Sequence, residues 1–221
     1  MSAHLLATLV WVLSSAPCFG WADLVNPPKR TVVVYLKTSP GQLVGPVEEM
    51  QYEAGVLMEA AGYTLDWRVL PRAPIEAVDA PIVVMELRGV CDAPERSGDA
   101  QPLADSSILA SAAVSNGEIL PFGSVQCDVL SRMVAGALPK SGSKREFLYG
   151  RAMGRLVAHE LYHILTKTRD HEDTGVGKSH FSAKDVLAEH FEFDNPSLAK
   201  LREPAGDGDV SEMDTIEEAG R

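Results

Sequence analysis

Runs of apolar residues along the first third of the chain predict strands of a sheet and one helix. Residues 30–37 (RTVVVYLK) and 81–87 (PIVVMEL) are continuous apolar runs rich in β-branched residues, as in strands buried inside a sheet. Residues 46–61 have a helical pattern and begin with Pro46, which a helix tolerates in its first turn. Residues 65–70 predict another strand. The predicted order therefore begins β-α-β-β.

The middle of the chain predicts a hairpin. Residues 107–114 and 118–122 are strand-like segments on either side of Asn116 and Gly117, a dipeptide typical of tight β-turns. Residues 126–137 form either a short helix or an irregular link, and the pattern does not decide between them.

A long helix is predicted over residues 143–168. Ser143 and Glu146 match a capping box at its start, and apolar residues follow at roughly helical spacing. Residues 182–191 are a candidate for a last helix. No internal repeat is evident in the sequence.

The N-terminus has the features of a secretory signal peptide. Residues 5–13 (LLATLVWVL) form an apolar core, and the small residues Gly20 and Ala22 lie just before the first acidic residue. The core is much shorter than the roughly 20 residues of a membrane-spanning helix. We expect residues 1–22 to be removed, leaving a secreted or periplasmic protein with one domain over residues 23–202 and no membrane attachment.

Two cysteines, Cys91 and Cys127, remain after the expected cleavage, because Cys18 leaves with the signal peptide. An even pair in an exported protein predicts one disulfide bond. Two separate buried thiols are the alternative.

The formal net charge of −11 excludes some partners. Residues 203–221 contain seven acidic residues and one basic residue, and they predict an acidic disordered tail. Neither the tail nor the rest of the chain has the basic stripe needed to bind nucleic acid or an anionic membrane.

The predicted long helix contains the pattern HExxH, from His159 to His163. Two histidines four residues apart leave the same helix face, so both imidazoles can bind one zinc ion. Glu160 lies beside them and can accept a proton from a water that zinc has made acidic. The pattern therefore predicts a zinc hydrolase. The alternative is that His159 and His163 are partly buried residues with ordinary hydrogen bonds.

The order of elements together with HExxH resembles the metzincin-like zinc peptidases, in the broad matrixin-like sense, over residues 30–171. The resemblance implies an α+β fold: a mixed, mostly parallel twisted sheet with a backing helix and an HExxH active-site helix. It also implies that an edge strand pairs with an extended substrate, and residues 107–122 would supply that edge. Alternatively, this hairpin only covers one side of the core.

The third metal ligand has several candidates. The metzincin pattern HExxHxxGxxH would place Gly and His at positions that Thr166 and Arg169 occupy here. His171 is eight residues after His163, and it can reach the metal if the helix ends near Thr168 and the chain turns back. Glu189, from the last predicted helix, is the alternative ligand. Four further candidates are Asp170, Asp173, His180 and His190.

These observations predict an exported zinc metalloendopeptidase that hydrolyses protein or peptide substrates. We expect His159, His163 and His171 to bind one catalytic zinc ion, and Glu160 to act as general base. The alternative is a secreted zinc-binding or scaffold protein with an inactive peptidase-like fold. Glu160 favours the enzyme, because a purely structural zinc site needs no general base.

Overall fold

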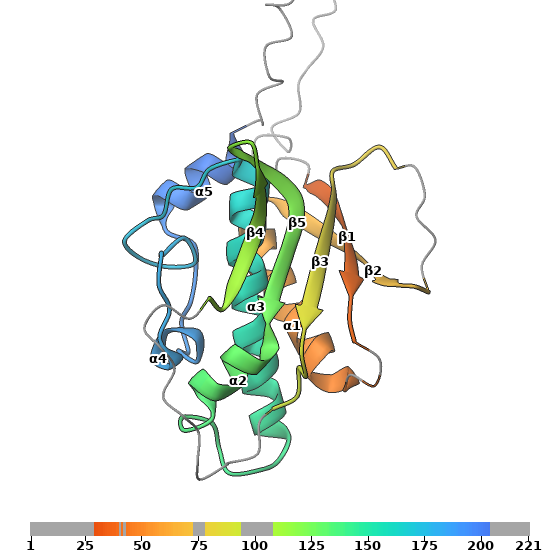
Figure 1. Cartoon of the computed structure of the whole chain (residues 1–221). Helices are drawn as coiled ribbons and strands as arrows, with labels where there is room; N and C mark the ends of the chain where they lie inside the picture. Colours follow the sequence, from red (N-terminus) through yellow and green to blue (C-terminus); the bar gives the residue numbers. More distant parts are fainter. Residues whose placement is uncertain (1–28, 40, 42, 73–77, 94–107, 204–221) are drawn as a thin grey trace, which may run out of the picture.

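The computed structural model describes residues 29–39, 41, 43–72, 78–93 and 108–203. The expected signal peptide and all but the first residue of the expected tail lie outside these residues. The fold is α+β, with one twisted sheet and two long helices packed behind it (Figure 1). Within the described residues, no helix is both long and apolar enough to cross a membrane.

Five strands form a mixed sheet in the order β2-β1-β3-β5-β4. Their bounds are β1 (Arg30–Lys37), β2 (Tyr63–Leu70), β3 (Ile82–Arg88), β4 (Ala110–Ser115) and β5 (Glu118–Gln126). The first four in the sheet order are parallel, and β4 is antiparallel to β5 at the edge. Asn116 and Gly117 make the tight turn between them, with φ of 51° and 86°. The predicted mixed, mostly parallel sheet is confirmed.

Five helices complete the described part of the chain. They are α1 (Val44–Ala60), α2 (Cys127–Val134), α3 (Ser143–Thr166), α4 (Ala183–Val186) and α5 (Asn195–Arg202). Residues 126–137, for which the sequence pattern left a short helix or an irregular link open, therefore contain a helix, α2. The capping box expected at Ser143 is wrong: Gly142 is the N-cap residue with φ of 95°, and no side chain caps the helix. Ser143 already belongs to the first turn.

The helix predicted over residues 182–191 is also wrong. A capping box does form at Ser182 and Asp185, but α4 ends at Val186 after a single turn. α5 follows instead, with Asp194 as its N-cap accepting a hydrogen bond from the Ser197 backbone N–H.

The buried Arg155 explains why the chain leaves the helical path after α4. Its Nη1 donates to the backbone carbonyls of Val186 at 3.0 Å and Ala188 at 2.7 Å. Its Nε donates to Glu53 Oε1 on α1 at 2.8 Å. Carbonyl oxygens that accept from the guanidinium point toward it and do not take part in the i to i+4 hydrogen bonds of a helix. Arg155 therefore holds an irregular segment against α3.

The disulfide pair lies where the sheet meets the helices. Cys91 follows β3 and Cys127 begins α2, and their Cα atoms are 4.8 Å apart at disulfide-bonding distance. Both residues are buried in the core. This geometry supports the expected Cys91–Cys127 bond.

Two glycines let α1 and α3 pack in close contact. A Cβ atom at Gly150 would lie 2.7 Å from the Pro46 carbonyl oxygen, and one at Gly154 would lie 2.7 Å from the Met50 carbonyl oxygen. These are backbone atoms, which cannot swing aside. α3 therefore carries the HExxH residues on a helix whose distance from α1 is fixed by backbone contact.

We expect Gly154→Ala to destabilise the protein although alanine favours helices. The added methyl group has to push α1 away, and such overpacking costs about 1–3 kcal/mol. Gly55→Ala on α1 is the matched control, because no atom lies within 4 Å of its Cβ position. There the gain in helix propensity should stabilise the protein by up to about 1 kcal/mol. Urea unfolding of both variants measures the difference, and equal effects would contradict the close packing.

Candidate metal centre

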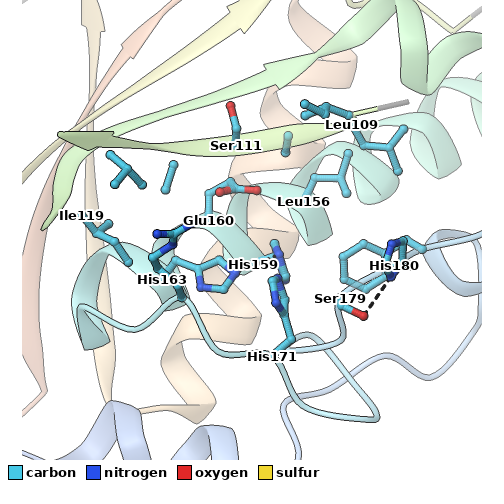
Figure 2. A pocket seen from close by; sticks show the side chains of 16 residues that line it. Leu109, Ser111, Ile119, Leu156, His159, Glu160, His163, His171, Ser179 and His180 are labelled. Atoms are coloured by element: carbon cyan, nitrogen blue, oxygen red, sulfur yellow. Dashed lines mark hydrogen bonds between the residues drawn. The ribbon is translucent and has the colours of Figure 1, made fainter. Parts of the chain in front are cut away.

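The HExxH residues lie in the last two turns of α3, on the side that faces an open cleft under the edge strand (Figure 2). His159 and His163 are each 7% exposed, and Glu160 is 3% exposed. The cleft has a volume of about 480 Å³. Its walls come from β4, the start of β5, α3 and the segment that follows α3.

Backbone carbonyls fix the tautomers of both helix histidines. His159 Nδ1 lies 2.7 Å from Val176 O, and His163 Nδ1 lies 2.8 Å from Thr168 O. A carbonyl oxygen only accepts, so each Nδ1 carries the proton and each Nε2 carries a lone pair. The two Nε2 atoms face each other at 3.1 Å. Two facing lone pairs repel unless a proton or a cation lies between them.

This spacing fits zinc. Two nitrogens that bind zinc tetrahedrally, each at 2.0–2.1 Å, are about 3.3 Å apart. Hydrogen bonds from the distal imidazole nitrogens to backbone carbonyls are also the usual outer support of zinc-binding histidines. The donor set and its tautomers therefore suit a zinc ion.

His171 joins the pair because the chain reverses directly after α3. The helix ends at Thr166, and Lys167 takes a left-handed conformation with φ of 54°. One nitrogen from each of His159, His163 and His171 lies within 4.8 Å of the others. The His171 ring centroid is 4.7 Å from that of His163. The structure thus brings the three expected histidines together, while their role as metal ligands stays a prediction.

The loop that supports His159 contains no metal-ligand motif in the sequence. The Val176 carbonyl orients His159, and the Val176 N–H donates to Glu192 O at 3.0 Å. Gly175 has φ of 66°, and a side chain there would overlap the Glu192 carbonyl. The pair of glycines around Val176 was the available clue, since each marks a close backbone approach.

Glu160 is surrounded by protein on the inner side of the cleft. Burial raises the pKa of its carboxyl group to about 8, although the Ala112 backbone N–H on β4 donates to it and lowers the pKa in part. Gly123 on β5 lies against the Glu160 Cβ position. A buried carboxyl group with a raised pKa is a stronger base than an ordinary glutamate.

The other candidate ligands do not belong to the group that the three histidines form. Glu189 and His190 are exposed and line a separate hollow beside Arg151. Asp170 and Asp173 are exposed. His180 lines the cleft with its Nδ1 2.9 Å from Ser179 Oγ, outside the group of three. Among the residues described, only His159, His163 and His171 form a group that could hold a metal ion.

The metal-free protein should lose stability between pH 6 and pH 8 because of Glu160. Its pKa is about 8 when folded and near 4.5 when unfolded, so in this window the folded state holds the extra proton. Stability therefore falls as pH rises, by about 2 kcal/mol. Urea unfolding in a chelator measures this loss. Glu160→Gln is the control and should not show it; an equal loss in the variant would contradict the assignment.

Acid should destabilise the metal-free protein for a separate reason. Burial lowers the pKa of His159 to about 3, and it lowers the pKa of His163 and His171 as well. Below the ordinary value of 6.5 the unfolded chain binds protons that folded His159 does not accept. Stability is therefore lost as pH falls from about 6.5 toward 3.

No model of a known protein family matches the sequence, and no curated protein matches it either.

Proposed function

We propose that this protein is an exported zinc-dependent endopeptidase of metzincin-like type. The observation that carries the proposal is the facing pair of His159 and His163 Nε2 lone pairs, 3.1 Å apart, with His171 nearby. Glu160 lies in the same cleft, next to these histidines. A structural zinc site usually has four protein ligands, whereas three ligands leave a position for water.

The residues have separate roles in the proposed reaction. His159, His163 and His171 would hold zinc, which when bound supplies a Lewis acid and makes water a nucleophile at neutral pH. Glu160 accepts the proton of the attacking water on its carboxylate. It then transfers that proton to the nitrogen of the leaving amine.

The edge strand β4 supports binding of an extended peptide. It is the last strand of the sheet, and it runs in the opposite direction to the other four described strands. Ser111, Ala113 and Val114 are exposed, and β4 lines the cleft above Glu160. An added strand would gain backbone hydrogen bonds there and pass over the histidines. This favours substrate binding over a purely covering role for the hairpin.

Metal analysis and proteolysis of the purified mature protein test the proposal. We expect one zinc ion per chain and cleavage of a casein-like protein or a peptide library. A chelator should stop the cleavage, and added zinc should restore it. Zinc without cleavage would favour the zinc-binding scaffold instead. Absence of zinc would leave only histidines with ordinary hydrogen bonds.

A further inference from the structure

Arg169 is a cationic side chain in the wall of the cleft with no partner in the described part of the chain. It is exposed, and it makes no hydrogen bond or ion pair with any described residue. It is also the one Lys or Arg among the residues that line the cleft, where the one carboxylate is the buried Glu160. A negatively charged ligand in this cleft would therefore meet one cationic side chain among the lining residues, the Arg169 guanidinium.

The cleft has two ends, and different residues line each of them. Leu109 and Leu156 lie at one end, and Ile119 and His163 lie at the other (Figure 2). Lys167 is tied to the second end, because its Nζ donates to Ile119 O at 3.0 Å. Arg169 follows two residues later, directly after the Thr168 carbonyl that contacts His163. Arg169 therefore belongs to the end near Ile119.

The direction of β4 determines which half of a bound peptide lies near the Ile119 end of the cleft. β4 runs from Ala110 to Ser115, toward the turn that precedes Ile119. Antiparallel pairing is the more stable per residue, and a peptide that pairs with β4 in this way has its N-terminal half at the Ile119 end. The residues before the scissile bond would then pass Arg169.

We propose that Arg169 forms a subsite for an acidic side chain, Asp or Glu, on the N-terminal side of the scissile peptide bond. This inference rests on the proposed function, and it names the substrate class of the same cleft. The guanidinium presents a fork of N–H donors that matches a carboxylate in bidentate geometry. Because Arg169 is exposed, solvent and salt screen the pair. The expected preference for an acidic residue is therefore about three-fold to five-fold.

Fluorogenic peptides test the subsite. The series is acetylated and amidated, has an Ala and Leu background, and carries Glu or Gln at each of three positions before the cleaved bond. The wild-type protein should cleave one Glu peptide with about three-fold to five-fold higher kcat/KM than its Gln counterpart. Arg169→Gln should remove this preference, and Arg169→Lys should restore part of it. The preference should also weaken in high salt.

Two outcomes would overturn the inference: equal cleavage of every Glu and Gln pair by the wild-type protein, or an unchanged preference in Arg169→Gln. Lys184→Gln is the matched control, because Lys184 is exposed on α4 and does not line the cleft. It should keep the wild-type preference. Zinc content should be equal in all the variants, which separates substrate recognition from loss of the metal site.

A binding measurement separates failure of the subsite from failure of the proposed function. The same peptides, with a fluorescent label, are titrated into zinc-loaded Glu160→Gln and into the double variant that also carries Arg169→Gln. Tighter binding of a Glu peptide, lost in the double variant, supports the subsite even if the wild-type protein cleaves nothing. Equal binding of Glu and Gln peptides overturns it, even if the wild-type protein is an active peptidase.

Discussion

Replacing Glu160 with glutamine should reduce peptide hydrolysis by about 10²-fold to 10⁴-fold or more while zinc remains bound. The amide keeps the shape of the side chain and can still accept from the Ala112 N–H. It cannot accept a proton from water or return one to the leaving amine. Turnover of a peptide-library substrate measures the loss, and metal analysis measures the zinc content.

Glu189→Gln is the matched control for this substitution. Glu189 is exposed and lines a different hollow, so the same chemical change there should leave turnover unaltered. Undiminished turnover in Glu160→Gln would contradict the proposed mechanism. Loss of zinc together with turnover would instead assign Glu160 a structural role at the site.

Features encoded by local pattern were predictable from the sequence. The apolar runs of β1 and β3 predicted strands because such runs fit a sheet covered on both faces. Asn116 and Gly117 predicted the turn because both tolerate positive φ. The four-residue spacing of His159 and His163 placed both imidazoles on one helix face, and they do approach each other in the structure.

Features that depend on distant contacts were not predictable in the same way. The helix expected over residues 182–191 is interrupted because Arg155, about 30 residues earlier, holds the carbonyls of that segment. The support of His159 comes from the Val176 carbonyl, and a backbone atom leaves no side-chain signature. α5 had a local signal that was overlooked: Asp194 as N-cap and Pro196 in the first turn.

The position of His171 was predictable from the sequence only in part. Its distance from His163 differs from the metzincin spacing, and the sequence alone left Glu189 as an alternative third ligand. The left-handed Lys167 reverses the chain, so His171 lies near the other two rings while Glu189 faces a separate hollow. A lysine gives no clear signal for such a turn, because this conformation is uncommon outside glycine and asparagine.

His171→Ala should therefore lower zinc affinity far more than the same change at other candidate ligands. His159 and His163 provide two ligands from one helix face, and a catalytic zinc ion needs a third from another direction. Loss of residues that merely support a ligand typically costs 10-fold to 100-fold in metal affinity. We expect the loss of zinc affinity in His171→Ala to exceed about 100-fold, and we expect peptide hydrolysis to be lost as well.

Competition with a zinc-binding dye measures this effect in His171→Ala and in three matched variants. His180→Ala removes a cleft histidine outside the group of three, whereas His190→Ala and Glu189→Ala remove side chains from the separate hollow. None of these three should lose the metal. If Glu189→Ala loses zinc and His171→Ala keeps it, the site has two histidines and one glutamate as ligands. The closeness of His171 to the other two histidines would then hold for the metal-free chain only, and the metzincin-like interpretation would be wrong.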